Sequence, residues 1–339
     1  MADPRGTINF TVRLSISPYH RYMPEAHTIA ARLEPQPLPE NIRSVQPGGG
    51  FGYRVELAWG SLRRWYLKTF RRRYVQRMAA LRIGSCDGCP HEILDPRDLK
   101  YCCNVCSCRW AEADDTFAWR KKIPFARWGM AELQIMGWPL LALAVFAGWF
   151  HWYLAIVPAV LLVFVVYFFR DPPRQIPSEP GCLVSPADGT VSEVAQIDYD
   201  LFLEGPAVRV SIFLSILNVH VNRSPAKSRV MSLKYAPGQF LNAMKAESAL
   251  HNENMWIALE EKEYPYRRLV VRQVAGLIAR RIVCALAPGE MIERGERFGM
   301  IKFGSRTELI MPADPDLVVL VRKGDKVKGG STVLARYPK

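Results

Sequence analysis

The sequence predicts an α+β protein: a mainly antiparallel β domain of the barrel-sandwich type, preceded by a membrane helical hairpin and a basic, Cys-rich helical extension. Three observations support this prediction. Short β-rich runs between Gly and Pro fill the second half of the chain, residues 133–169 carry no charged side chain, and a basic segment and a cysteine cluster come before them. With 339 residues, 49% of them hydrophobic, the chain can form two or three domains with their own cores.

We divide the chain into four parts. Residues 1–50 are predicted to be a disordered tail, because they lack apolar periodicity and are rich in Pro and Gly. Residues 51–128 form the extension, residues 129–170 form the hairpin, and residues 171–339 form the β domain. The formal net charge of +13 indicates an anionic partner, either nucleic acid or a membrane surface.

Residues 61–82 predict a basic amphipathic helix. Leu62, Trp65, Phe70 and Met78 recur at helical spacing, while eight Arg and Lys residues and no acidic residue occupy much of the remainder. Such a helix is suited to an anionic membrane surface, with its apolar side buried in lipid. An RNA-binding helix and a purely structural helix are the alternatives, and the apolar segment downstream favours lipid.

Six of the eight cysteines lie close together after this helix. Two C-x-x-C pairs, separated by thirteen residues, are formed by Cys86, Cys89, Cys103 and Cys106. Two such pairs can offer four thiolates to one tetrahedral ion, with His91 as a further candidate, so we predict a structural zinc site that resembles a zinc ribbon. Free thiols in a reducing compartment are an equally good interpretation of the same pattern.

Residues 133–169 are 37 consecutive residues without Asp, Glu, Lys or Arg. A bilayer span needs about 20 apolar residues, so this length favours two short helices over one. His151 is the expected turn, since the Trp and Tyr residues beside it favour the headgroup level. Basic residues flank both ends, which favours a hairpin that returns to the side it entered from. Whether it spans the bilayer or only dips into it stays open, and a buried core hairpin is the alternative.

The predicted localisation rests on the start of the chain and on the basic residues that flank the apolar segment. Met1 is followed by mixed polar sequence without the apolar stretch of a secretory signal. We therefore expect the protein at the cell membrane, with its main body on the cytoplasmic face.

Beyond Phe169 the chain is predicted to be mostly β. The expected strands cover 182–184, 189–191, 208–213 and 269–274, with a helix at 240–249. Residues 289–295 and 324–330 form a weak repeat of the pattern G-[DE]-x-[IV]-x-x-G. This pattern is common in barrel-sandwich carrier domains, and it supports the β architecture without indicating a carrier function, because the expected lysine is missing.

Asp188, His220 and Ser305 each lie in a short segment marked by Gly or Pro. An acid, a histidine and a hydroxyl are the residue types of a nucleophilic triad, in which the histidine activates the hydroxyl. By residue type alone, each of the three also fits an ordinary turn or strand position.

Five fragments, in this order, resemble the phosphatidylserine decarboxylase family, in its shorter type with an FGSR context. They are FFRDPPR (168–174), SPADGTV (185–191), NVHVNRSP (218–225), RQVAGLIARRIV (272–283) and FGMIKFGSRTE (298–308). The resemblance covers roughly residues 125–339. It implies that residues 171–339 are a pyruvoyl-dependent decarboxylase domain that cleaves itself between residues 304 and 305.

The resemblance also implies how the cofactor is made. The hydroxyl of Ser305 attacks the carbonyl of Gly304, with His220 as the base and Asp188 holding the tautomer of that histidine. Elimination and hydrolysis then convert residue 305 into a pyruvoyl group. The products are a β chain, residues 1–304, and an α chain, residues 305–339.

The implied reaction converts phosphatidylserine to phosphatidylethanolamine and CO2. The pyruvoyl ketone forms a Schiff base with the substrate amine and accepts the electrons released when the carboxylate leaves as CO2. His220 is the candidate that protonates the product carbanion. Phosphatidylserine and anionic lipid are the expected partners, nucleic acid is disfavoured, and substrate-binding residues are not identified. The oligomeric state is left open, with a homo-oligomer among the states considered.

Two other functions compete with the enzyme. One is a membrane-anchored, carrier-like β domain that never processes, and the joint presence of Asp188, His220 and Gly304-Ser305 disfavours it. The other is a membrane-tethered zinc-ribbon protein that binds nucleic acid. It accounts for the extension but leaves the five C-terminal fragments unexplained.

Overall fold

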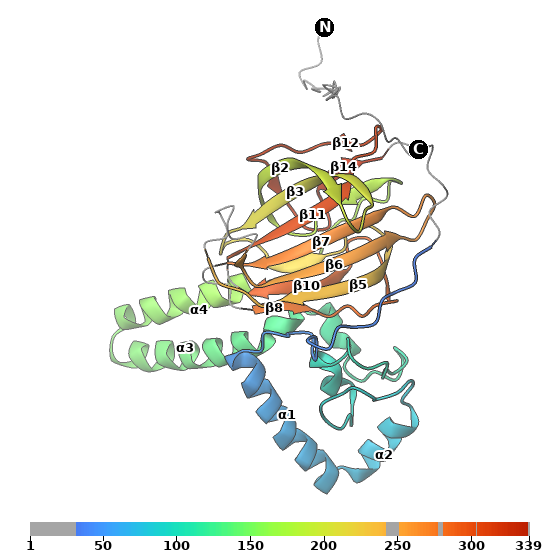
Figure 1. Ribbon diagram of the computed structural model, residues 1–339. Coiled ribbons are helices and arrows are strands. Elements are labelled where there is room, and N and C mark those ends of the chain that lie inside the picture. The colour runs from blue at the N-terminus through green and yellow to red at the C-terminus, as the bar shows by residue number, and fades with distance from the viewer. Residues whose placement is uncertain (1–31, 242–250, 277–280, 303, 338–339) are drawn as a thin grey trace. The chain divides into compact units, whose positions relative to one another are not determined.

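An eight-stranded sheet, in which every neighbouring pair is antiparallel, organises the β domain (Figure 1). Its order is β13 (Lys326–Val327), β2 (Gly189–Asp200), β3 (Gly205–Leu214), β11 (Ser305–Pro312), β7 (Arg268–Ala275), β6 (Asn254–Glu261), β5 (Ser228–Ala236) and β9 (Met291–Ile292). The sheet twists and curls, as Figure 1 shows, and the strands predicted at 189–191, 208–213 and 269–274 lie within it.

Two three-stranded sheets complete the domain. One has the order β4 (Val221–Arg223), β10 (Arg297–Lys302) and β8 (Arg281–Cys284), and the other has β1 (Cys182–Val184), β14 (Val333–Arg336) and β12 (Val318–Val319). The computed structural model describes residues 32–241, 251–276, 281–302 and 304–337. Residues 1–31 of the predicted tail and most of the helix predicted at 240–249 lie outside this range. Residues 33–339 form one unit.

The main core lies on one side of the large sheet. Side chains alternate along each strand, so Ile212 and Leu214 of β3 and Leu309 and Met311 of β11 point to the same side, where they are buried. Val271 of β7 joins them. The β architecture predicted from the sequence is therefore confirmed as a mixed α and β fold around a curled antiparallel sheet.

The predicted repeat lies at both edges of this sheet, in β9 and β13. Each short strand is followed, three residues after its end, by a glycine with a left-handed backbone, Gly295 (φ 75°) after β9 and Gly330 (φ 77°) after β13. The N–H of each glycine donates to the carbonyl of a serine in a Ser-Pro-Ala segment, Gly330 to Ser185 and Gly295 to Ser224, at 2.8 Å in both cases. The two edges of the sheet are thus built from the same unit.

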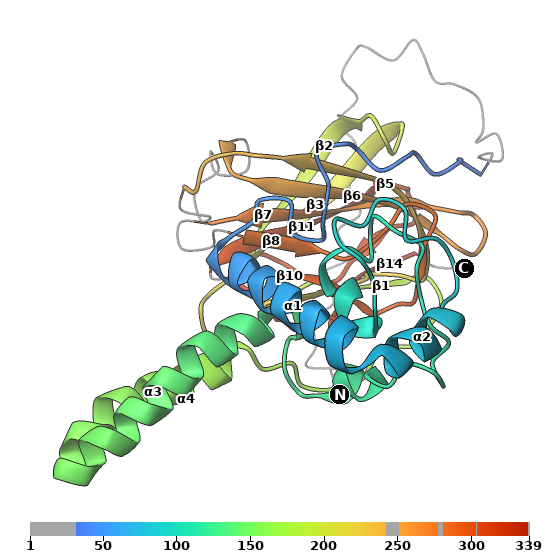
Figure 2. The same cartoon turned by 90° about the horizontal axis from the view of Figure 1, so that it is seen from below.

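The helical hairpin consists of α3 (Met130–Phe150) and α4 (Ile156–Phe168), joined at His151 and the short turn η4 (Trp152–Ala155). The turn therefore lies at the predicted residue, and Figure 2 shows the helices side by side, leading away from the strands. Trp149 and Trp152 beside the turn are 87% and 77% exposed. Arg127–Phe150 is the one helix among the described residues that is long and apolar enough to cross a membrane.

The first helix of the extension begins earlier than predicted. Helix α1 covers Phe51–Phe70 and α2 covers Arg72–Ala80, so the helix predicted at 61–82 starts ten residues sooner and breaks at Arg71. Three short 3-10 helices follow: η1 (Pro96–Tyr101), η2 (Ala118–Lys122) and η3 (Arg127–Gly129).

The prediction of a disordered tail up to residue 50 is wrong for residues 33–50. Ile42 and Val45 are buried, and the carbonyl of Val45 accepts a hydrogen bond from the N–H of Cys284 in β8 at 2.8 Å. A few apolar residues and backbone hydrogen bonds are enough to hold this irregular segment against the β domain, although it has no periodic pattern.

Candidate functional site

The predicted cleavage site lies where the chain passes from one sheet to another. Strand β10 of the small sheet ends at Lys302, and β11 begins at Ser305, in the large sheet between β3 and β7. Gly304, in between, has φ 50°, in the left-handed region that favours glycine. An added Cβ would meet no atom within 4 Å, so the backbone angle and not a lack of space selects glycine here.

Ser305 is held by the backbone ladders at the start of β11. Its Cα partners are Leu214 of β3 and Ala275 of β7. The side chain is fully buried, and within the described part of the chain its Oγ has no hydrogen-bond partner. An unpaired buried hydroxyl costs about 1–3 kcal/mol and is uncommon in native structures. Such a group is a candidate for chemistry.

His220 contacts Gly304, the residue that precedes this serine. Its Nδ1 is 2.9 Å from the carbonyl oxygen of Asn218. A carbonyl only accepts, so Nδ1 carries the proton and Nε2 keeps its lone pair. Nε2 in turn accepts a hydrogen bond from the N–H of Gly304 at 3.3 Å. The lone pair that a base needs is therefore directed at Gly304, the residue on the N-terminal side of the predicted cleavage site.

Burial keeps His220 neutral. The side chain is 1% exposed. Burial lowers its pKa to about 4; the hydrogen bond to Asn218 opposes this shift, and the cation of Arg170 adds to it. The imidazole is therefore in its basic form at neutral pH.

The hairpin contacts this histidine directly. The ring of Phe168, the last residue of α4, lies 4.5 Å from the imidazole between centroids. Lys302, the last residue of β10, forms an ion pair with Glu132 of α3 and donates to Gln46 at 3.1 Å. Sequence reasoning missed Phe168 and Lys302 as neighbours of the site, although both lie in fragments that carry the family resemblance.

Asp188 occupies a different position from the one predicted. Its carboxylate binds the guanidinium of Arg174 at 2.8 and 3.0 Å and accepts the N–H of Gly329 at 2.7 Å. Within the described chain, no hydrogen bond joins Asp188 to His220. The expected contact is replaced because Arg174 binds the carboxylate, while Asn218 binds Nδ1 of the histidine.

Three buried polar side chains form a hydrogen-bonded chain on the side of β11 that Ser305 also faces. The Nδ2 of Asn222 donates to the hydroxyl of Thr307 at 3.1 Å, and the Nε2 of Gln273 donates to Oδ1 of Asn222 at 2.9 Å. Sequence reasoning did not select these three residues. The available signal was that all of them lie within the family fragments.

Comparison with known proteins gives the same family. The model of the phosphatidylserine decarboxylase family matches residues 161–335. The phosphatidylserine decarboxylase proenzyme of Rhodopirellula baltica is 48% identical over 239 residues, which cover 70% of this chain and 99% of that protein. Those of Symbiobacterium thermophilum (48% identical; 60% of this chain, 94% of the relative) and Carboxydothermus hydrogenoformans (43%; 59% and 93%) are also similar.

The chain belongs to the phosphatidylserine decarboxylase family. It is a carboxy-lyase that converts phosphatidylserine to phosphatidylethanolamine and CO2, and the proenzyme names of its relatives imply that it processes itself. Family membership thus confirms the decarboxylase prediction, including its pyruvoyl cofactor in general terms. The extension lies outside the segment that the family model matches.

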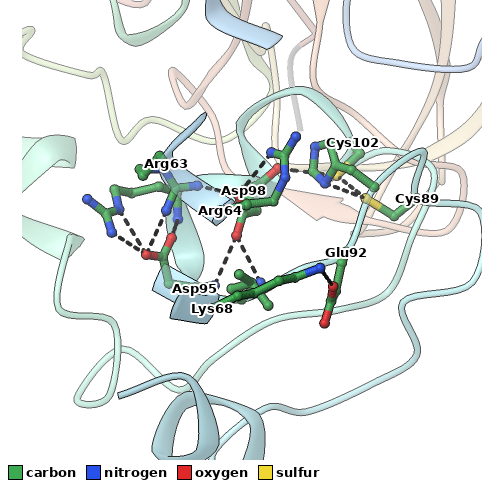
Figure 3. Close-up of polar contacts among 11 residues, drawn as sticks. Arg63, Arg64, Lys68, Cys89, Glu92, Asp95, Asp98 and Cys102 are labelled. Carbon is green, nitrogen blue, oxygen red and sulfur yellow. Dashed lines mark hydrogen bonds and ion pairs between the residues drawn. The ribbon is translucent and has the colours of Figure 1, made fainter. Parts of the chain in front are cut away.

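The cysteines of the extension form a cluster that keeps two of the four predicted ligands, Cys89 and Cys106, and includes Cys102 in addition. Figure 3 shows Cys89 next to Cys102. The Sγ atoms of Cys89, Cys102 and Cys106 all lie within 4.8 Å of one another. Cys103 is not part of the cluster, because its Sγ points toward the carbonyl of Ala285 at 3.9 Å. Cys102 faces the cluster and takes the place that the C-x-x-C spacing assigned to Cys103.

Two further side chains border the cluster. Nδ1 of His91 lies 3.7 Å from Sγ of Cys89. The hydrogen bond with Cys102, at 2.8 Å, is the main cause that lowers the pKa of Cys89 to about 4; burial opposes this effect, and His91 adds to it. The predicted ligand Cys86 is not part of the group of three sulfurs. Burial raises the pKa of Cys108, and the neighbouring Cys86 adds to this shift.

Next to the cluster, two aspartates of the η1 turn hold helix α1, as Figure 3 shows. Arg63 binds Asp95 at 2.9 Å and also binds Asp98, and Arg64 binds Asp98 at 3.3 Å. Both carboxylates are fully buried. Arg63 and Arg64 were predicted as part of a basic lipid-facing helix, but they serve an internal contact here. Exposed basic residues lie further along, among them those at 71–73.

Proposed function

We propose that this chain makes its pyruvoyl group by cleaving itself between Gly304 and Ser305, with Ser305 as the nucleophile and His220 as the base. The main support is neutral His220, whose Nε2 accepts the N–H of Gly304 at 3.3 Å. Gly304 directly precedes Ser305, whose buried hydroxyl has no hydrogen-bond partner among the described residues. A pyruvoyl group at residue 305 fits this position, because Ser305 already starts a strand whose backbone is fixed on both sides.

In the first step, Nε2 of His220 accepts the hydroxyl proton of Ser305 as its oxygen attacks the carbonyl carbon of Gly304. The C–N bond of the peptide breaks and an ester forms, with the proton passing to the released amine. Loss of the Cα proton of residue 305 then expels the carboxylate of Gly304. Water converts the resulting dehydroalanine to a ketone, and ammonia leaves.

The pyruvoyl group, once formed, supplies the electrophile and electron sink for decarboxylation. His220 remains beside it, held by the carbonyl of Asn218, and is the residue that we assign to moving the proton at the reacting carbon. Asp188 receives a positioning role in place of its predicted contact with His220, because it ties Arg174 to the turn at Gly329.

The membrane part of the proposal rests on the hairpin. Its exposed tip carries Trp149 and Trp152, the residue type that favours the headgroup level. Its other end places Phe168 on the ring of His220. A hairpin embedded from the cytoplasmic face of the cell membrane would therefore bring the site to its lipid substrate, with the exposed basic residues 71–73 facing anionic headgroups.

The cysteine cluster has no part in these steps. For it we propose a structural role, as a zinc site within the extension.

The intact mass of the purified protein tests the processing proposal. We expect two chains, the smaller one covering residues 305–339 with a blocked N-terminus, and a single uncut chain for Ser305→Ala. Wild-type protein that stays at full length with a free Ser305, and makes no phosphatidylethanolamine in phosphatidylserine vesicles, would contradict it.

A further inference from the structure

The three clustered sulfurs have the spacing of ligands to one metal ion. Thiolates about 2.3 Å from zinc at tetrahedral angles lie about 3.8 Å apart. The Sγ atoms of Cys89, Cys102 and Cys106 lie within 4.8 Å of one another, so small rotations bring them to this spacing. The distance of 3.7 Å between Sγ of Cys89 and Nδ1 of His91 is close to the separation of about 3.6 Å between a sulfur and a nitrogen ligand.

We propose that Cys89, Cys102, Cys106 and His91 bind one zinc ion. This ion holds the η1 turn in the conformation in which its two carboxylates bind the arginines of helix α1. The ligand set refines the structural zinc role proposed above and rests on it. Three thiolates and one imidazole form a tetrahedral set that suits zinc, whereas carboxylate and carbonyl sets suit magnesium and calcium.

The link from the metal to the helix is short. Cys102 directly follows η1 (Pro96–Tyr101), and its Sγ lies 3.4 Å from the carbonyl of Asp98. The carboxylate of Asp98 accepts the N–H groups of Leu94 and Asp95 and binds Arg63 and Arg64 of α1 (Figure 3). A metal that fixes Cys102 therefore fixes the turn whose carboxylates hold the helix.

The next residue fixes the same turn on its other side. Cys103 points away from the cluster, toward Ala285 in the β domain. The two consecutive cysteines thus differ in their contacts: Cys102 faces the proposed metal, and Cys103 packs against the β domain. This difference supplies a matched pair of variants, because the two substitutions are chemically the same and one residue apart.

The test is the zinc content of full-length protein purified without oxygen, chelator or added metal. We expect about one zinc per chain for wild type and for Cys103→Ser, and less than about 0.1 for Cys102→Ser. His91→Ala should lower zinc affinity at least tenfold in a competition with a chromogenic chelator. In Cys102→Ser, hydrogen exchange should speed up in α1 (Phe51–Phe70), while cleavage at Gly304 stays as in wild type.

Three results would overturn the proposal. The first is a metal-free wild-type protein, and a mass 2 Da lower would identify a disulfide as the cause. The second is zinc that Cys103→Ser loses and Cys102→Ser keeps. The third is full zinc affinity in His91→Ala together with loss of zinc in Cys86→Ser. The mass of the same samples reports cleavage at residue 304, so failure of the metal site is distinguished from failure of the decarboxylase proposal.

Discussion

The β domain and the extension hold their key side chains in different ways. Backbone ladders to β3 and β7 fix Ser305, and the carbonyl of Asn218 orients His220. The extension consists of helices and 3-10 turns, where the contacts of Asp95 and Asp98 with arginines provide the corresponding order. Backbone hydrogen bonds between strands make a site rigid without ion pairs. A turn that buries two carboxylates, in contrast, depends on the cations that compensate their charge.

The largest expected effect lies in the β domain. In His220→Gln, the glutamine can still accept the N–H of Gly304 but cannot take the proton of Ser305, so self-cleavage should slow by about 1,000-fold or more. A time course of intact mass measures this. His151→Gln, at the hairpin turn, is the matched control and should cleave normally. Cleavage of His220→Gln at the wild-type rate would remove the histidine from the mechanism.

Asp98→Asn is the corresponding substitution in the extension. Removing one charge from a buried ion pair costs about 3 kcal/mol, and here the loss should stay local, because Asp98 contacts only the extension among the described residues. We expect hydrogen exchange in α1 to rise by up to about 100-fold and cleavage to remain unchanged. Asp87→Asn, an exposed position in the same segment, should change neither. Unchanged hydrogen exchange of α1 in Asp98→Asn would show that other contacts hold this helix.

The two regions also differ in how well the sequence predicts them. The ordered family fragments select Ser305 and His220, and the structure brings both to Gly304, since Ser305 follows this glycine and Nε2 of His220 accepts its N–H at 3.3 Å. In the extension the C-x-x-C spacing selected Cys103. Spacing specifies which sulfurs are near in sequence, but the direction of a turn decides which one faces the cluster, and packing against Ala285 sets that direction. The pairing of Asp188 with Arg174 was missed for a similar reason, since it depends on tertiary contacts.

Phe168 tests whether the hairpin and the catalytic site are coupled. In Phe168→Ala the imidazole of His220 loses the ring packed against it at 4.5 Å, so its orientation becomes less defined. We expect cleavage to slow by about 10-fold to 100-fold. Val166→Ala, on the exposed side of the same helix, is the control and should have no effect on the rate. Equal rates in the two variants would mean that the hairpin does not position the histidine.

The smallest effect concerns pH, and it distinguishes a buried base from an exposed one. Burial lowers the pKa of His220 to about 4, from 6.5. Between these values the unfolded chain binds more protons than the folded one, so the stability contributed by neutral His220 is present above pH 6.5 and is lost as the pH falls through this window. The cleavage rate of newly folded precursor should therefore change less than about twofold from pH 8 to pH 5, and then fall about tenfold per unit below pH 4. A cleavage rate that halves near pH 6.5 would instead show that the imidazole of His220 is exposed to water. The site in the β domain would then lack the burial that distinguishes its base from an exposed histidine.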